Sequence, residues 1–235
     1  MWSPEDMARK KIVRLGGDVR EHPRYSIEDA AHLLRIPLST MKAWCRGQTY
    51  RSKSTGKVHS FTSVLIPASP TEGLLSFYNL AEAHVLRATR ERNIPLANVR
   101  RALAYIREQI PTTKYPLISH EFLTYGKSVF IEHLGDTINA TAHGQKAMRE
   151  MLDKYLQRID RDGLGMPITL YPMNTQYLSI NPTISSGQAV VKGTRIMACV
   201  LAARRKSGES YDELIQDYGL THSQIEHAIT EYAAS

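Results

Sequence analysis

The sequence predicts a mainly α-helical protein of the α+β class, with helices throughout and a few short strands. Three observations support this prediction. Apolar residues recur at helical spacing, as at Leu96, Val99 and Leu103. Several helix starts are marked by a capping-box spacing, such as Ser210 with Glu213. Runs of β-branched residues are short and are bounded by glycine or proline.

The first distinct unit is the stretch from Tyr25 to Gly47, YSIEDAAHLLRIPLSTMKAWCRG. Ser26 and Asp29 have the spacing of a capping box, so a helix should begin directly after Ser26. Pro37 disfavours helical geometry at the residue before it, which predicts that this helix ends near Arg35. Two short helices joined by a tight turn form a helix-turn-helix.

The second helix should begin at a Ser39 cap and run to about Arg46. Met41, Trp44 and Cys45 share one face, which predicts that they belong to the core. The alternative interpretation of the whole stretch is a small helical hairpin with a solvated face. The opposite face carries residues that are hydrogen-bonding, cationic or small, and these suit a DNA groove: Ser39, Thr40, Lys42, Ala43 and Arg46.

A polar and basic segment follows, QTYRSKSTGKVHSFTSVLIPAS, with Gly56 at its centre and the β-branched run Val64–Ile66 near its end. This pattern predicts a hairpin beside the helix-turn-helix, which we call the wing. A solvated surface loop is the alternative. The basic side chains of the wing should lie over DNA phosphates: Arg51, Lys53, Lys57 and His59.

Charge is divided unevenly along the chain. Residues 1–116 contain 19 Lys and Arg against 10 Asp and Glu, a balance of +9, and the remainder contains 11 against 13, a balance of −2. A cationic first half favours a polyanionic ligand, because neutralising phosphates releases condensed counterions. The near-neutral second half requires a different partner.

Composition is typical of a soluble globular protein, since 42% of the 235 residues are hydrophobic and 23% are charged. No apolar run approaches the roughly 20 residues of a membrane helix, and the N-terminus lacks the apolar centre of a signal peptide. We therefore expect a cytoplasmic protein without a membrane partner. Cys45 and Cys199 lack metal-ligand spacing, which predicts reduced core thiols and neither a metal site nor a cofactor.

Two further helices are predicted in SFYNLAEAHVLRATRERNIPLANVRRALAYIREQ, separated by Asn93 and Pro95. Asn79 with Glu82 has the spacing of a cap for the first of them. His84 lies on the flank of that helix, where a lone histidine is far more often a surface or packing residue than a ligand or base.

In order and spacing, the helix-turn-helix, the basic wing and the segment LSFYNLAEAHVLRATRERNIPLANVRRAL resemble the DNA-binding domain of MerR-type regulators, over residues 25 to about 110. The resemblance implies a winged helix-turn-helix that binds double-stranded operator DNA, and we expect a homodimer. The chain lacks the cysteine-bearing effector loop of the metal-sensing members. No long coiled-coil helix follows Gln109, so a different module comes next.

The middle segment begins with EFLTYGKSVFIEH, whose two short runs about Gly126 predict a hairpin. GQKAMREMLDKYLQRIDRDG then predicts an amphipathic helix. Its apolar stripe should pack in the core, and the alternative is a dimer seam. Glycine and proline residues from Gly163 to Pro172 predict a linker that ends near Asn174.

The C-terminal segment predicts strands at 177–180 and around 190–191, followed by three helices that start near Met197, Ser210 and Thr221. These helices also have helix-turn-helix form. The last one, HSQIEHAITEY, carries two glutamates and no lysine or arginine, so its surface would repel phosphate. We therefore assign this unit to protein contact or dimerisation.

The same C-terminal residues resemble the domain of unknown function 433, whose pattern is approximately G-x-P-x-x-x-G-T-R-I. Here the pattern stands as GQAVVKGTRI at residues 187–196, with Ala189 at the usual proline position. A MerR-like domain in front of this domain resembles VapB-type antitoxins that carry both modules. Membership would imply a PIN-domain ribonuclease toxin as the partner and repression of the shared operon. The residues that would bind the toxin are unknown.

Motifs for phosphate-cradling loops, serine nucleophiles and zinc hydrolases are absent from the sequence, so we expect no enzyme. Asp153, Asp160 and Asp162 could suggest a two-metal nuclease, but solvated carboxylates beside a linker are the better interpretation. The leading hypothesis is a DNA-binding antitoxin. The alternative is a stand-alone MerR-like transcription regulator whose C-terminal domain dimerises or senses a ligand.

We expect the chain to divide into a basic N-terminal tail, a DNA-binding domain, a segment with a hairpin, a helix and a linker, and an interaction domain. The basic clusters of the first part could instead form an arm along a DNA backbone, but terminal segments are usually mobile. The corresponding ranges are residues 1–24, 25–116, 117–173 and 174–235.

Overall fold

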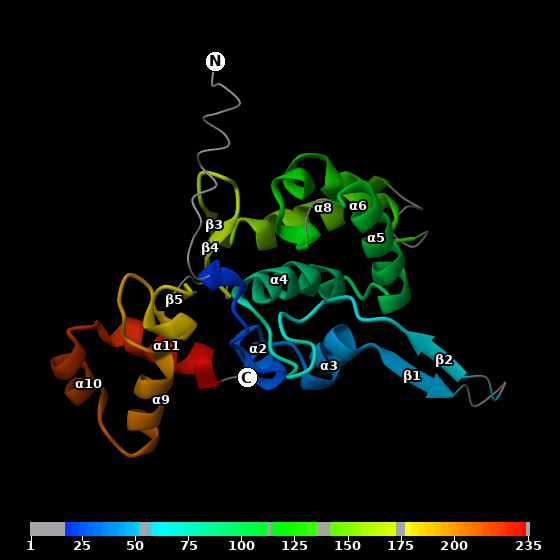
Figure 1. The fold of residues 1–235 in the computed structure, drawn as a ribbon. Coiled ribbons are helices and arrows are strands. Elements are labelled where there is room, and N and C mark those ends of the chain that lie inside the picture. The colour runs from blue at the N-terminus through cyan, green and yellow to red at the C-terminus, as the bar shows by residue number, and fades with distance from the viewer. Residues whose placement is uncertain are drawn as a thin grey trace.

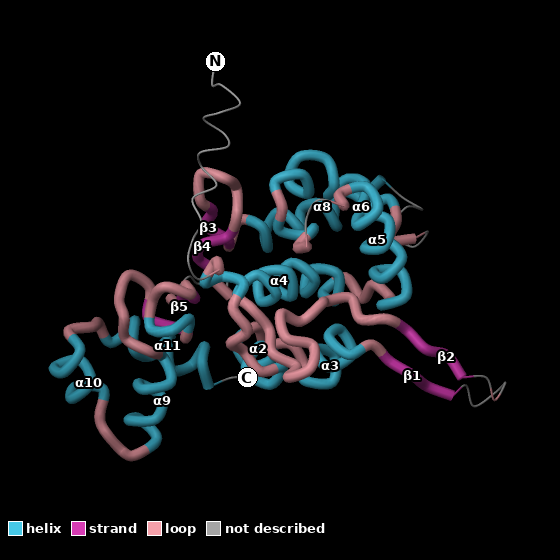
Figure 2. Tube along the Cα trace, viewed as in Figure 1, coloured by secondary structure: helices cyan, strands magenta, loops and turns pink. Residues whose placement is uncertain are grey.

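The structure is a computed structural model that describes residues 17–51, 56, 58–111, 114–135, 142–172 and 177–233. Helices make up most of these ranges, and a four-stranded antiparallel sheet joins their middle and C-terminal parts (Figures 1 and 2). The predicted fold class, mainly α with some β, is confirmed.

The helix-turn-helix consists of α2 (Ile27–Leu33) and α3 (Leu38–Arg46). The Ser26 hydroxyl accepts from the Asp29 amide at 2.9 Å, and the Asp29 carboxylate accepts from the Ser26 amide at 3.2 Å, so the predicted capping box is confirmed. The helix ends at Leu33, slightly before the predicted Arg35. Arg35 instead lies in the turn with a left-handed backbone, at φ 49°.

The predicted Ser39 cap of α3 is wrong. The N-cap is Pro37, whose carbonyl accepts the first helical bond from the Met41 amide at 3.0 Å. Proline supplies no side-chain cap, but its fixed φ places the chain correctly for entry into the helix, so Ser39 already lies in the first turn. The prediction for the inner face is confirmed, because Met41, Trp44 and Cys45 are all buried.

The wing is an antiparallel hairpin of β1 (Gln48–Arg51) and β2 (Val58–Phe61), and it projects away from the rest of the molecule (Figure 1). The hairpin was predicted, but the run Val64–Ile66 is not one of its strands. Val64 and Leu65 are buried, and their amides donate to the Trp44 carbonyl at 2.9 and 3.0 Å. These two backbone hydrogen bonds therefore join the segment after β2 to the end of α3, and both side chains are buried in the core.

Two helices follow the wing, α4 (Phe77–Glu91) and α5 (Leu96–Gln109). The predicted cap of Asn79 with Glu82 is wrong by one turn. Ser76 is the N-cap, and its hydroxyl accepts from the Asn79 amide at 3.2 Å while the Asn79 side chain accepts from the Ser76 amide at 3.1 Å. Glu82 lies instead in the buried interior of the helix.

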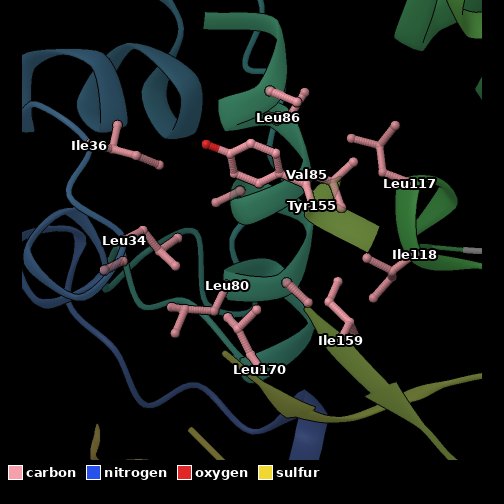
Figure 3. Close-up of a cluster of buried hydrophobic side chains, with 14 of the residues drawn as sticks. Leu34, Ile36, Leu80, Val85, Leu86, Leu117, Ile118, Tyr155, Ile159 and Leu170 are labelled. Atoms are coloured by element: carbon pink, nitrogen blue, oxygen red, sulfur yellow. The ribbon is translucent and has the colours of Figure 1, made fainter. Parts of the chain in front are cut away.

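Helix α4 is the central element of the core, because it is buried on nearly every face. Figure 1 shows it between the helix-turn-helix and a layer of α5, α6 and α8. Figure 3 shows α4 side chains between the turn of the helix-turn-helix and residues from later segments. The labelled residues of this cluster are Leu34, Ile36, Leu80, Val85, Leu86, Leu117, Ile118, Tyr155, Ile159 and Leu170.

The hairpin predicted about Gly126 is wrong. The segment is helical, with η2 (Pro116–Ile118) followed by a π-helical turn, η3 (Phe122–Gly126), and by α6 (Lys127–Glu132). Gly126 has ordinary helical geometry, at φ −61°. A Cβ there would lie 3.2 Å from the Ile110 Cδ1 atom, so this glycine permits close helix packing and makes no turn.

Helix α8 (Ala142–Leu156) buries its apolar stripe, as the core interpretation predicted. The linker predicted after it is instead a hairpin of β3 (Ile159–Arg161) and β4 (Pro167–Leu170). The Asp162 carboxylate accepts from the Leu164 and Met166 amides at 3.0 and 2.9 Å, which organises the tight turn. Gly163 and Gly165 of the predicted linker therefore lie in a turn between paired strands, where the sequence predicts a flexible connection.

Strand β5 (Leu178–Ile180) pairs with β4, and β6 (Ala189–Val191) pairs with β5, giving the antiparallel order β3-β4-β5-β6. The short helix η4 (Ser185–Gly187) connects the last two strands. This sheet crosses the boundary that we predicted near residue 173, and the division into domains stays a prediction.

Three helices complete the described chain: α9 (Ala198–Lys206), α10 (Tyr211–Tyr218) and α11 (His222–Ala233). Their predicted starts are confirmed. Ser210 and Glu213 form the predicted capping box of α10. Figure 1 shows these helices beside α2, on the side of the molecule opposite the wing.

Residues 17–24 of the predicted basic tail lie partly exposed on the protein surface, and residues 1–16 lie outside the described ranges. The short helix η1 (Val19–Glu21) places Arg20 against Asp162, with Nη1 and Oδ2 2.6 Å apart. Arg24 donates to the Pro182 carbonyl at 2.9 Å. These cations are therefore engaged within the protein itself.

Candidate nucleic-acid interface

The outer face of α3 exposes three of the polar side chains that we predicted to bind DNA. Ser39 and Arg46 are exposed, and the Lys42 side chain is 41% exposed. They are free to face a groove because Met41 and Trp44 occupy the inner side of the helix. This face therefore offers a hydroxyl and two cations to a ligand.

Lys42 is paired within the protein. Its Nζ atom lies 3.1 Å from the Glu28 Oε1 atom, across the helix-turn-helix from α3 to α2. The hydrogen bond from Lys42 lowers the pKa of Glu28, so this carboxylate is ionised at neutral pH. Exposed ion pairs of this kind contribute little stability, and a phosphate can compete for the lysine.

Thr40 and Ala43 differ from their neighbours on α3. The Arg90 Nη1 atom of α4 donates to the Thr40 hydroxyl at 2.8 Å. Ala43 is only 6% exposed and is one of the residues that line an open hollow of about 440 Å³ between α3 and α4. Because so little of Ala43 is accessible, we leave it out of the proposed surface, and its predicted role in DNA binding stays untested.

The structure describes only part of the wing segment that carries the four predicted basic residues. The backbones of Arg51 and His59 lie in β1 and β2, and their side chains lie outside the described part. Lys53 and Lys57 also lie outside the described residues. The role of these four residues at phosphates stays a prediction.

Arginines on α4 and α5 hold the interface in place, and sequence patterns do not reveal this. Arg87 donates to the Leu34 carbonyl at 2.7 Å and so fixes the turn of the helix-turn-helix. Arg100 and Arg107 donate to the Thr62 and Val64 carbonyls at 2.9 and 2.7 Å, at the base of the wing. Their carbonyl partners lie far away in sequence, so no local spacing could have identified them.

The remaining chemically notable groups have structural roles. His84 is fully buried, its Nε2 atom lies 3.2 Å from the Tyr155 carbonyl, and burial lowers its pKa to about 3. This confirms it as a packing residue. Cys45 is buried and Cys199 is half-buried, and both are free thiols.

The three aspartates that could suggest a nuclease each engage a different partner. Asp153 pairs with Lys127, Asp160 accepts from the Tyr171 hydroxyl at 2.8 Å, and Asp162 pairs with Arg20. Within the described ranges, no group of three or more His, Cys, Asp or Glu could hold a metal ion. No helix in that part of the chain is both long and apolar enough to span a membrane.

Two parts of the chain match known families. Residues 23–103, which include the helix-turn-helix, the wing, α4 and half of α5, match the family described as "Putative DNA-binding HTH domain". Residues 178–233, from β5 to α11, match the family described as "Protein of unknown function (DUF433)". The MerR-type resemblance of the first part stays a prediction.

Relatives of the whole chain occur in Mycobacterium tuberculosis. The chain is 25% identical to "Putative antitoxin VapB45" over 97% of its own length and 100% of that protein. It is 24% identical to "Uncharacterized protein Rv2308" over 87% of its length and 88% of that protein. The crystal structure of Rv2018 is similar with a TM-score of 0.63 at 21% identity, covering 88% of this chain and 98% of that one, which shows a shared fold.

Proposed function

We propose that this protein is the antitoxin of a type II toxin–antitoxin system. In this proposal α3 and the wing bind operator DNA, and the C-terminal part binds and neutralises a PIN-domain ribonuclease. We further propose that it represses its own operon as a homodimer in the cytoplasm. Similarity over nearly the whole chain to a protein named as an antitoxin supports the first part, and the DNA-binding family match supports the second.

One observation carries the DNA-binding part: Ser39, Lys42 and Arg46 stand together on the outer face of α3, beside a projecting hairpin. A helix of this kind fits the major groove, where its cations reach phosphates or guanine edges. The wing can then follow the neighbouring backbone.

The C-terminal part has a different electrostatic character. Helix α11 carries no lysine or arginine, and its Glu226 side chain is 54% exposed. Such a surface does not favour DNA phosphates, which leaves it available to a protein partner.

Two measurements test the proposal. Purified protein should bind a duplex from directly upstream of its own gene, with an affinity that falls steeply as salt rises. Co-expression with a neighbouring gene for a small acidic-site nuclease should yield a stable complex and restore growth that the nuclease alone arrests.

The outcomes distinguish the proposal from a stand-alone regulator. DNA binding without any co-purifying nuclease, together with normal growth when the neighbouring gene is expressed alone, would contradict the antitoxin role and leave a transcription regulator. Loss of both DNA binding and complex formation would contradict the whole proposal.

A further inference from the structure

Helix α2 is held at both ends by the C-terminal part of the chain. Directly before it, the buried Tyr25 hydroxyl donates to the Gly187 carbonyl at 2.9 Å. Directly after it, the Arg35 Nη2 atom donates to the Thr230 and Glu231 carbonyls at 3.2 and 2.8 Å. Arg35 therefore caps the last turn of α11, where a cation also suits the helix dipole.

Side chains also meet across this α2–α11 junction. The His32 and Tyr232 rings contact edge to face, with centroids 4.6 Å apart. Glu231 is only 8% exposed, and both of its carboxylate oxygens are buried without a hydrogen-bond partner. The Arg35 Nε and His32 Nε2 atoms are buried without a partner as well. Four buried polar atoms without a hydrogen-bond partner therefore lie at this junction.

The Glu231 carboxylate has neither an ion-pair partner in the described residues nor room for a bridging water molecule. No ion pair joins it to Arg35 in the described part of the chain, although the guanidinium binds the backbone of the same turn. The hollow between α2, the sheet and α11 has a volume of about 10 Å³, at or below what one water molecule needs. A buried, unpaired carboxylate is costly when ionised and much less costly when neutral.

Two charged groups act on the Glu231 carboxylate, Arg35 from the turn after α2 and His227 from α11. Beside it lies Tyr232, whose ring contacts His32 and whose hydroxyl is affected by Asp29 of α2 and Cys199 of α9. Burial raises the pKa of Glu231, and the charges of Arg35 and His227 oppose this rise without reversing it. The closed junction therefore favours the neutral carboxyl.

We propose that the α2–α11 junction is a proton-sensitive latch, closed when Glu231 is neutral and loosened when Glu231 is ionised. Because α2 packs directly against α3, the latch controls how firmly the proposed DNA-binding face is supported. The latch goes beyond the proposed function. Its test requires no DNA, so its failure would leave that function untouched.

Hydrogen–deuterium exchange of the full chain from pH 4.0, below the ordinary glutamate pKa of 4.5, to pH 8.0, corrected for intrinsic exchange rates, tests the latch. Protection in the last turn of α11 and in α2 should fall several-fold as pH rises, while peptides from α8 serve as an internal reference. Glu231→Gln should keep the high protection at every pH. Glu226→Gln, an exposed glutamate on the same helix, should behave as the wild type does.

Three results would overturn the latch. The first is wild-type protection at the junction that does not change with pH. The second is protection that rises with pH because ionised Glu231 recruits Arg35. The third is a Glu231→Gln protein that retains the wild-type pH dependence. If Glu231→Gln does not fold, the pH dependence of protection in the wild type alone decides whether the latch exists.

Discussion

Lys42 is the clearest example of a side chain whose proposed role competes with an existing partner. In the free protein it is paired with Glu28, and both side chains are about half exposed. In the proposed complex a DNA phosphate would take the lysine from this carboxylate, which would then remain close to the phosphate. We therefore expect Glu28 to make a repulsive contribution to the affinity of the wild type for DNA.

Replacing Glu28 with glutamine should raise affinity for duplex DNA several-fold at low salt, because Lys42 is released and a repulsive charge is removed. Fluorescence anisotropy with the upstream duplex measures this change. Glu150→Gln, which neutralises an exposed glutamate on α8, is the control and should leave affinity unchanged. Equal affinities for wild type and Glu28→Gln would show that Lys42 does not approach DNA.

Gly187 is the residue whose identity the structure constrains most directly. Its backbone has φ +75°, and a Cβ would lie 2.3 Å from the Tyr25 hydroxyl and 2.9 Å from the Arg24 Nη1 atom. Gly187→Ala should destabilise the protein by about 2 kcal/mol or more, because strain and a clash act together.

Gly193→Ala is a matched control for this substitution. Gly193 has φ +79° and no atom within 4 Å of the position of a Cβ, so it isolates the backbone contribution. Urea unfolding should give the larger loss of stability for Gly187→Ala. Equal losses for the two variants would show that the Tyr25 contact to Gly187 is not tight in solution.

Helix α4 places two ionisable residues inside the core. Burial raises the pKa of Glu82 to about 8, against an ordinary 4.5, even though the carboxylate accepts from the Leu117 amide. Burial likewise lowers the pKa of His84 to about 3, against an ordinary 6.5. Each group is therefore held in its neutral form.

These pKa shifts predict opposite effects on the free energy of unfolding. The folded state binds the Glu82 proton more tightly than the unfolded state does. The contribution of Glu82 to the free energy of unfolding is therefore largest below pH 4.5 and is lost as pH rises toward 8. The folded state binds the His84 proton more weakly than the unfolded state does. The contribution of His84 to the free energy of unfolding is therefore largest above pH 6.5 and is lost as pH falls toward 3. Each slope can reach about 1.4 kcal/mol per pH unit.

Urea unfolding of Glu82→Gln separates the two contributions. This variant should lose the decline in stability between pH 6.5 and 8 and should keep the decline on acidification. Glu150→Gln, with its exposed side chain, should follow the wild type throughout. An unchanged alkaline decline in Glu82→Gln would contradict a neutral Glu82 in the folded protein.

The helices that the sequence predicts best are those with local signals. The boxes Ser26–Asp29 and Ser210–Glu213 depend on residues three positions apart, and both are present in the structure. Gly126 shows where local signals mislead, because glycine suits both a hairpin turn and a close helix contact. Only the approach of Ile110 decides between them, and that contact is invisible in a sequence window.

A better signal for the helical segment was present in the sequence. The Ser119 hydroxyl accepts from the Phe122 amide at 3.2 Å, as a serine does at a helix start. The outer face of α3 was predictable, because helical periodicity fixes which side chains oppose Met41 and Trp44. Burial of Ala43 was not, since it depends on α4.

The two halves of the molecule differ in charge but are not mechanically independent. The sheet joins the middle and C-terminal parts, and α2 contacts the C-terminal part at both of its ends. The cationic first half remains the part suited to DNA.

The most direct measurement is the salt dependence of DNA affinity for wild type and for Lys42→Ala/Arg46→Ala. Lys154→Ala/Lys206→Ala, which removes two exposed cations far from α3 in sequence, is the control. We expect the first variant to lose at least about tenfold in affinity and the slope of log affinity against log salt to fall by about 2, while the control matches the wild type. Unchanged affinity and slope in the first variant would contradict the assignment of α3 as the DNA-binding helix.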